Sequence, residues 1–296
     1  MKNFEISTDS TCDLYANEIK EFGIYVGHLN FVVTKMGNMT DCEDNFQNEQ
    51  QYVDFYEQLK NGATSKTSIL NLQAHIDLFT KMAKNGVKNA IHISQGRGLS
   101  PTIDNAKQAI EIVKKDYPDI NYVAIDSNTT TVGEGMLVKV AVEMRDKNAT
   151  MQETVDKINS LKDKIQHLII VDDLNFLKRG GRISSAAAVF GTMLQVKPII
   201  EMSKEGLLKV VRKEKGMRRA IKSIVEEAKE KYTFNDVNKY VIVHTNNTEA
   251  ATILQNLIKE ELGVLPDIRI MGPIIGSHVG PNAVAFAFIS NQERPF

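Results

Sequence analysis

The sequence predicts an α/β protein of two domains, the first a doubly wound, mainly parallel sheet and the second an α/β domain with a mixed or antiparallel sheet. Three observations carry this prediction. The chain has 296 residues, which is more than one small core requires. Strand and helix patterns alternate in its first half, and strand patterns predominate in its second half. We place the boundary after residue 165, which gives domains 1–165 and 166–296.

In the first half, short apolar runs alternate with amphipathic helical patterns. The clearest helix is 50–59, where Tyr52, Phe55, Tyr56 and Leu59 recur at the helical period. Such βαβα alternation is typical of a parallel sheet covered by helices on both faces. The expected strands are 4–7, 24–33, 87–93 and 122–125, and the expected helices are 13–22, 50–59, 72–83, 102–115, 136–144 and 153–164.

In the second half, apolar runs follow one another with few helices between them. Only the segments 217–231 and 248–262 show strong helical patterns, and a further helix is expected to begin near Ser184. Consecutive strands joined without helices favour antiparallel pairing. The expected strands are 167–171, 197–200, 207–211 and 240–243, followed by strands within 268–289.

The segment 272–281 is rich in glycine and is expected to form a turn between two strands, with His278 at its apex. Its glycines, among them Gly276 and Gly280, allow positive φ angles and the close approach of another group. Ser277 and His278 can both donate hydrogen bonds. This segment is therefore the clearest place for a bound ligand.

Hydroxyl-rich segments follow several of the expected strands. They are 8–11, 94–100 and 126–131, and a similar segment, 63–68, lies between two expected helices. Ligands of parallel α/β sheets bind outside the carboxyl ends of the strands, and hydroxyls beside helix N-termini suit an anion. Each segment taken alone is more often a helix cap. Their expected convergence at one sheet edge favours a binding site.

Several classes of function are disfavoured by the sequence. A net charge of −1 gives no general attraction to nucleic acid. Gly96-Arg97-Gly98 fails as a dinucleotide fingerprint, because the third glycine is replaced by Pro101. The histidines lack metal-ligand spacing, and no nucleophile elbow is present. We therefore expect no metal, no cofactor and no catalytic residues. Without an apolar leader or spanning run, we expect a cytoplasmic protein with at most transient membrane contact.

Two charged segments offer further candidates. Residues 204–219 contain seven basic and two acidic side chains, which suits either a solvated face or the docking of an acidic partner or a phosphate group. Lys215, Arg212 and Arg218 are the candidate partner-binding residues of this segment. Asp172 and Asp173 are adjacent in an expected strand and point to opposite faces, so salt bridges are favoured over a cation site.

In this order, the motifs resemble those of the DegV family, which includes the fatty-acid-binding subunits of bacterial fatty acid kinase. The resemblance covers essentially the whole chain. Its motifs are Thr8-Asp9-Ser10-Thr11, Thr64-Ser65, Ile93-Ser94-x-Gly96, Asp126-Ser127, Val171-Asp172-Asp173-Leu174 through Gly180-Gly181-Arg182-Ile183, Lys197-Pro198, and Gly272-Pro273 through His278-Val279-Gly280-Pro281.

The resemblance implies a two-domain protein that binds a long-chain fatty acid between its domains and presents the carboxylate to a partner kinase for acyl-phosphate formation. The acyl chain would run into the second domain. The carboxylate would be held by Thr64, Ser65, Ser94, Gln95 and His278, with Gly276, Ser277 and Gly280 supporting the loop. At the position where kinase-binding members often carry arginine, this chain has Lys215.

Two alternatives remain open. The first is an enzyme acting on a small carboxylate or ester, with Ser94 or Thr64 as nucleophile beside His278. The second is a protein that binds a different small ligand. The second alternative is allowed because Gln95 replaces a serine of the family pattern and the loop that follows it is displaced by Arg97 and Gly98.

Overall fold

The computed structural model describes residues 2–183, 195–234 and 239–296, and it divides into two compact units. The first unit comprises residues 1–31, 41–47 and 67–163. The second comprises residues 32–40, 48–66 and 164–296. Each is an α/β structure, and the predicted fold class is confirmed. The helix expected from Ser184 lies outside the described residues.

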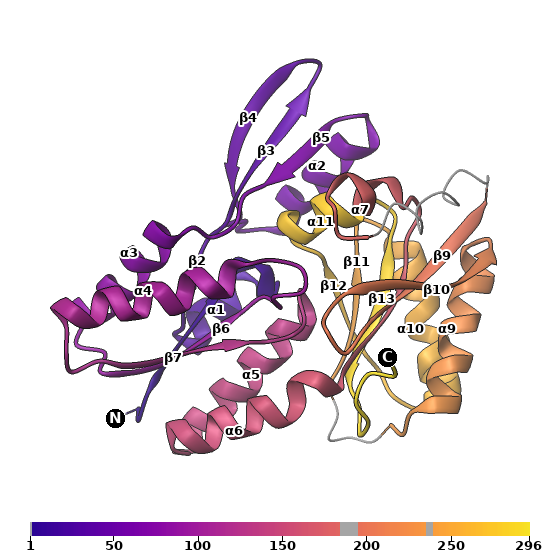
Figure 1. Ribbon diagram of the computed structural model, residues 1–296. Coiled ribbons are helices and arrows are strands. Elements are labelled where there is room, and N and C mark those ends of the chain that lie inside the picture. Colours follow the sequence, from indigo (N-terminus) through magenta and orange to yellow (C-terminus); the bar gives the residue numbers. More distant parts are fainter. Residues whose placement is uncertain (1, 184–194, 235–238) are drawn as a thin grey trace. The chain divides into compact units, whose positions relative to one another are not determined.

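The first unit is built on a four-stranded sheet in the order β2-β1-β6-β7, in which every neighbouring pair is parallel. Helices α3 and α4 lie on one face of this sheet, and α5 and α6 lie on the other (Figure 1). Its elements are β1 (Glu5–Asp9), η1 (Ser10–Cys12), α1 (Ala16–Phe22), β2 (Tyr25–Gly27), α3 (Leu72–Lys84), β6 (Asn89–Ser94), α4 (Thr102–Asp116), β7 (Asn121–Asp126), α5 (Val132–Asp146), α6 (Met151–Leu161) and η2 (Lys162–Lys164).

The second unit contains a six-stranded sheet in the order β10-β9-β8-β13-β11-β12, in which only the β11–β12 pair is parallel. The predicted mixed, mainly antiparallel sheet is therefore present. Its strands are β8 (Ile165–Ile170), β9 (Val196–Met202), β10 (Leu208–Lys215), β11 (Tyr240–His244), β12 (Asp267–Ile270) and β13 (Val284–Ile289). Its helices are α2 (Glu49–Lys60), α7 (Asn175–Arg179), α9 (Met217–Lys231), α10 (Thr248–Leu262) and α11 (Pro273–Val279).

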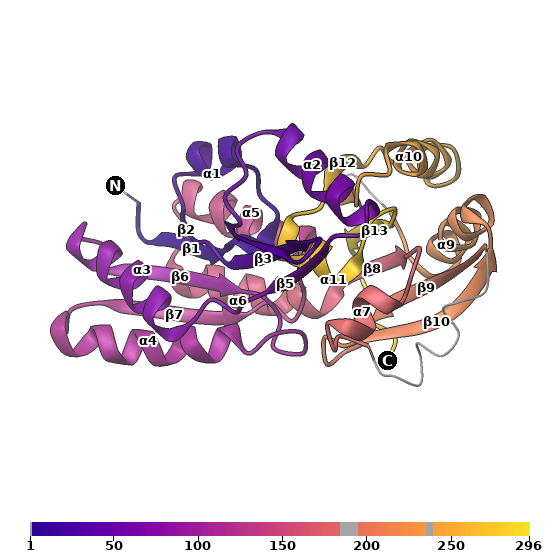
Figure 2. The ribbon, with the colours of Figure 1, turned by 90° about the horizontal axis from the view of Figure 1, so that it is seen from above.

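Helices α9 and α10 cover one face of the six-stranded sheet, as Figure 2 shows from above. Their apolar faces contribute Ile221, Ile224 and Leu254 to a core that also contains Phe286 and Phe288 of β13. Both helices occupy the segments predicted from their periodicity. Burial of these side chains, at about 1.5–3 kcal/mol for each large apolar group, fixes which face each helix turns to the sheet.

A three-stranded sheet, in the order β4-β3-β5, departs from the sequence prediction. Residues 24–33 were expected to form one strand region, but the chain forms β2 and then β3 (Asn30–Lys35), followed by β4 (Asn38–Glu43). The segment expected to be a loop around Thr64 forms β5 (Thr64–Thr67). Its hydroxyl-rich sequence indicated a loop because one face of this small strand is exposed rather than packed on a core.

The largest local departure concerns the glycine-rich segment. The expected turn is wrong: after Gly272 the chain forms α11, with Pro273 in its first turn. Proline suits this position because its fixed φ angle matches the helix and its missing N–H is not needed there. Most of α11 is buried. Gly276 lies against Tyr56 of α2, whose hydroxyl donates a hydrogen bond of 2.8 Å to the carbonyl of Met271.

We predict that Gly276→Ala destabilises the protein by about 1–3 kcal/mol, the usual cost of overpacking. An added Cβ would lie 2.2 Å from the Tyr56 hydroxyl oxygen, and Tyr56 is buried and hydrogen-bonded, so it has little freedom to move. This clash opposes the gain of about 1 kcal/mol that alanine brings to a helix. Urea unfolding of the single and double variants measures the effect. The cost should fall in a Tyr56→Phe background, which lacks the nearest atom; an equal cost in both backgrounds would contradict the proposed clash.

Candidate functional site

In the first unit, the hydroxyl-rich segments meet around the buried carboxylate of Asp9 at the end of β1. The Ser94 hydroxyl donates to Asp9 Oδ2 over 2.9 Å, and the backbone N–H of Gln95 donates to the same oxygen over 3.0 Å. The backbone N–H of Thr11 donates to Asp9 Oδ1 over 3.1 Å. The strand ends therefore converge as expected, but on a carboxylate of the chain itself.

A second buried carboxylate, Glu134 in the first turn of α5, extends this cluster. The Thr8 hydroxyl lies 3.0 Å from Glu134 Oε1, and the Thr11 hydroxyl lies 2.8 Å from Glu134 Oε2 and also contacts Asp9 Oδ1. Burial raises the pKa of Glu134 well above its ordinary value, and the charge of Asp9 raises it further. The sequence analysis missed both carboxylates as site members. The Thr-Asp-Ser-Thr motif was the available signal for Asp9, whereas nothing local marks Glu134.

These contacts restrict what the predicted residues Ser94 and Gln95 can do. A serine hydroxyl has one hydrogen, and that of Ser94 is donated to Asp9. The side-chain amide of Gln95 has two hydrogens and donates one to Thr130 Oγ1 over 3.1 Å. Gln95 therefore keeps a donor for another group, while Ser94 holds an internal carboxylate.

In the second unit, β5 and α11 bring two predicted residues together. Ser65 Oγ lies 2.7 Å from Ser277 Oγ, and the Ser277 hydroxyl is 2.6 Å from the carbonyl oxygen of Pro273. Ser277 is buried, Ser65 is half-buried, and the preceding Thr64 is exposed. Two hydroxyls from residues distant in sequence thus meet at Ser277, the residue that precedes His278.

His278 packs against the Gly180 loop that follows α7. A Cβ on Gly180 would lie 2.1 Å from His278 Nδ1, so only glycine allows this approach. Burial, with a further effect of the Arg182 charge, lowers the pKa of His278 to about 4. Burial also lowers the pKa of Arg182. Arg182, which donates to the carbonyl of Gly180, is a basic group that the sequence analysis did not place near His278.

The three candidate partner-binding residues have different surroundings. Arg212 is engaged internally: its guanidinium pairs with the buried carboxylates of Glu227 and Glu201 and donates to Ser223 Oγ over 2.9 Å. Lys215, the last residue of β10, and Arg218, in the first turn of α9, are exposed. Within the part of the chain that the structure describes, no ion pair is formed by either of them.

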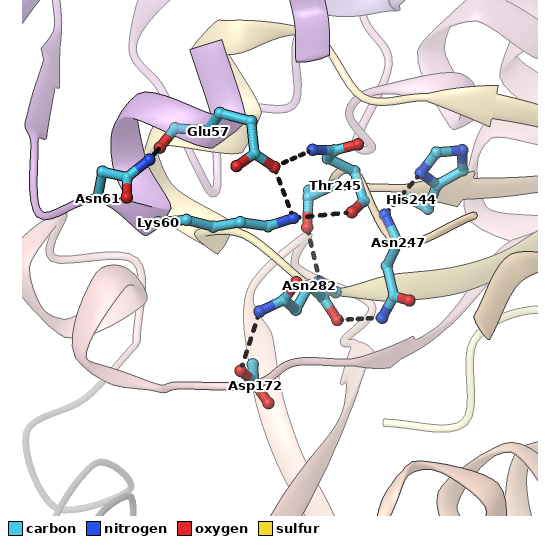
Figure 3. A network of polar contacts seen from close by, with 10 residues as sticks. Glu57, Lys60, Asn61, Asp172, His244, Thr245, Asn247 and Asn282 are labelled. Atoms are coloured by element: carbon cyan, nitrogen blue, oxygen red, sulfur yellow. Dashed lines mark hydrogen bonds and ion pairs between the residues drawn. The ribbon is translucent and has the colours of Figure 1, made fainter. Parts of the chain in front are cut away.

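A polar network joins α2 to the loops that follow β11 and precede β13 (Figure 3). Asn246 Nδ2 donates to Glu57 Oε1 over 2.7 Å, and Asn247 Nδ2 donates to the carbonyl of Asn282 over 2.9 Å. Asn282 Nδ2 in turn reaches Asp172 Oδ2 over 3.4 Å. The carboxylate of Asp172 also forms an ion pair with Lys197, in line with the salt-bridge interpretation.

Two other kinds of site are absent from residues 2–183, 195–234 and 239–296. No group of three or more His, Cys, Asp or Glu side chains is arranged to hold a metal ion. No helix is long and apolar enough to cross a bilayer.

Comparison with known families and curated proteins identifies the family. The model of a family described as uncharacterised proteins of the DegV family matches residues 3–291. The chain belongs to the DegV family. A DegV domain-containing protein of Clostridium perfringens is 31% identical, with 100% of both chains covered. One from Lactococcus lactis is 30% identical, with 98% of this chain and 99% of the other covered.

Solved structures of DegV proteins share the fold. A fatty acid binding DegV family protein from Streptococcus agalactiae has a TM-score of 0.80 and 26% identity, with 99% of this chain and 100% of the other covered. A DegV lipid binding protein from Thermotoga maritima has a TM-score of 0.83 at 23% identity, with the same coverage.

We predict that His278 of this DegV protein titrates near pH 4, below its ordinary value of about 6.5. Burial disfavours the imidazolium, and the positive charge of Arg182 disfavours it further. The replacement Arg182→Gln should therefore raise the pKa of His278 toward its ordinary value. Histidine ring resonances followed by NMR between pH 3 and 8 measure both values. A lower His278 pKa in Arg182→Gln would contradict the assigned role of the guanidinium.

We predict that Arg212→Gln costs about 2–4 kcal/mol of stability at pH 8, because it removes the cation paired with buried Glu201 and leaves Glu227 with Lys231 alone. Burial, with a further effect of Glu227, raises the pKa of Glu201 to about 7. Below that pH the variant can protonate Glu201, so the cost should be smaller at pH 5. Urea unfolding at both pH values measures this. The control Lys222→Gln removes an exposed charge that pairs with Glu226 and should change stability little; an equal cost at both pH values would refute the buried-pair explanation.

Proposed function

We propose that this protein binds a long-chain fatty acid and is a carrier rather than an enzyme. Several solved DegV structures with TM-scores of about 0.8 are described as fatty-acid-binding or lipid-binding proteins. The one from Streptococcus agalactiae is among them. The match extends over the whole chain rather than over one unit. This coverage supports transfer of the ligand class.

One observation in the second unit carries the proposal: His278 packs against the Gly180 loop, whose carbonyl accepts from Arg182, and it directly follows Ser277, whose hydroxyl pairs with that of Ser65. His278 and Arg182 both have lowered pKa values because burial disfavours their charged forms. Ser277 precedes His278 in α11, and Ser65 lies on β5. The hydroxyl oxygens of these two serines are 2.7 Å apart. A carboxylate beside these groups would favour the charged forms of His278 and Arg182, and it can accept a hydrogen bond from the Ser65 hydroxyl.

The energetics of the ligand suit such a site. An unpaired buried carboxylate costs several kcal/mol, so it requires two or more donors. Each methylene transferred from water contributes about 0.8 kcal/mol, so an acyl chain supplies most of the affinity. We assign the head-group contacts to Thr64, Ser65 and His278. Gln95, with its remaining amide hydrogen, is the better donor candidate of the first unit, because Ser94 already donates to Asp9.

We further propose that the bound carboxylate is presented to the catalytic subunit of a fatty acid kinase. The exposed Lys215 and Arg218 support this step because they form a basic surface that an acidic partner would recognise. Arg212 is a weaker candidate for docking, since its guanidinium serves the internal pair with Glu201 and Glu227.

Solvent extraction of the purified protein followed by mass spectrometry tests the function. We expect an acyl chain in the extract, and uptake of added oleate or palmitate by the delipidated protein. Loaded protein mixed with ATP and a fatty acid kinase catalytic subunit should yield acyl phosphate if presentation occurs. Absence of both endogenous and added fatty acid would reject the proposal.

Variants locate the head group. Ser65→Ala, Thr64→Val and His278→Gln should each weaken oleate binding about 10- to 100-fold, as expected for a hydrogen bond to a charged group worth about 1.5–3 kcal/mol. Thr252→Val is the matched control, because its hydroxyl donates to the Thr248 carbonyl on the exposed surface of α10. Ser94→Ala separates two roles: a change in stability without a change in affinity would restrict Ser94 to holding Asp9.

A further inference from the structure

The second unit contains a cavity of about 610 Å³ at the start of α9. Its volume lies within the range of about 300–1,000 Å³ that is typical of small-molecule sites. None of the residues proposed to hold the fatty-acid carboxylate contributes to its walls. The lining residues are Asp172, Lys197, Lys215, Gly216, Met217, Arg218, Arg219, Asn247, Glu249, Ala250, Ile253 and Asn282.

Positive charge predominates on one wall of this cavity. Lys197 is neutralised by its ion pair with Asp172. Lys215, Arg218 and Arg219 lie within five consecutive lining residues, are exposed, and form no ion pair among the described residues. Three cations at one wall repel one another, and no acidic side chain lies in the first turn of α9 to offset them. With four basic and two acidic side chains, Asp172 and Glu249, the lining as a whole is net positive.

The backbone adds to this potential. Helix α9 is 15 residues long and begins at Met217, and the preceding Gly216 provides no side-chain cap for the first N–H groups. The N-terminus of a helix carries a partial positive charge, so arginines are electrostatically unfavourable there, whereas an anion is stabilised. Both arginines of the cavity occupy this unfavourable position. An anion in the cavity would offset both the repulsion among the basic side chains and the partial positive charge of the helix N-terminus.

The remainder of the cavity wall has a different chemistry. Asn247 and Asn282 belong to the polar network of Figure 3: Asn247 Nδ2 donates to the backbone carbonyl of Asn282 over 2.9 Å, and Asn282 Nδ2 donates to Asp172 Oδ2 over 3.4 Å. His244, whose pKa burial lowers to about 4, accepts the backbone N–H of Asn247 over 3.1 Å. Ile253 and Ala250 add an apolar surface, and Glu249 adds an acceptor. Such a wall suits the organic part of a ligand.

We propose that this cavity binds a small phosphorylated organic molecule. Its phosphate contacts Lys215, Arg218 and Arg219 at the start of α9, and its organic part lies against Ile253, Asn247 and Asn282. A phosphate is favoured over a single carboxylate because its two negative charges and three acceptor oxygens match several cations, and arginine binds it in a bidentate geometry. The proposal does not rest on fatty-acid binding.

Isothermal titration calorimetry with inorganic phosphate, AMP and adenosine tests this assignment on the purified protein, with no kinase present. Both phosphate and AMP should bind, and adenosine should bind at least tenfold more weakly than AMP. The comparison of the first two probes identifies the source of the phosphate: tighter AMP binding supports an organic phosphate. Equal affinity of AMP and inorganic phosphate would overturn the organic part of the assignment and leave a site for free phosphate.

The double variant Lys215→Gln/Arg218→Gln should weaken AMP binding at least tenfold. Lys222→Gln/Lys229→Gln removes the same charge from exposed positions of the same helix, where these lysines pair with Glu226 and Glu261, and should leave the affinity unchanged. Equal losses in both double variants would reveal only diffuse attraction and reject the site. Binding of neither phosphate nor AMP would reject it as well. Oleate binding, measured on the same proteins, should not change, so failure of this proposal and failure of the fatty-acid proposal are separable.

Discussion

The close packing of α11 against α2 and α7 is the constraint on which the candidate site of the second unit depends. Three glycines make it possible. Gly276 admits the Tyr56 hydroxyl, Gly180 admits the His278 ring, and Gly280, with φ of +79°, lies where a Cβ would be 2.4 Å from the Phe176 ring. Because none of these contacts tolerates a Cβ without displacement, the position of His278 is set by backbone approach rather than by side-chain bonding alone. The same packing excludes water from Ser277, which is buried.

The first unit meets a different demand, which is to accommodate buried carboxylates. Asp9 and Glu134 lie at the carboxyl end of the parallel sheet, and the hydroxyls of Thr8, Thr11 and Ser94 are committed to them. A hydroxyl-rich strand end therefore signals a polar cluster without revealing the charge of what it holds. Here the charge is internal, and an incoming anion would meet negative groups unless a donor such as the Gln95 amide lies between them.

Much of the fold follows from the sequence, because periodicity reports burial directly. The apolar stripe at Tyr52, Phe55, Tyr56 and Leu59 correctly gave α2, and the strand-rich second half correctly gave a mixed sheet. The failures share one physical cause, which is that tertiary contacts override local preference. The segment after Gly272 is helical because its glycine packs on Tyr56, and β5 is a strand because it pairs with β3. The basic run gave Lys215 and Arg218, but their cavity also requires Asn247 and Asn282, which nothing local connects to them.

The electrostatics of the two proposed sites differ in a way that separates their ligands. At His278 and Arg182, burial lowers both pKa values, so binding of an anion there would raise them and couple ligand binding to proton uptake by the imidazole. At the start of α9 the cations are exposed and already charged, so an anion there would bind without proton uptake but with strong screening by salt. A long apolar ligand can supply the free energy to desolvate its single charge in the first environment. A phosphorylated metabolite has little apolar surface for that purpose, and the exposed cations of the cavity match it better.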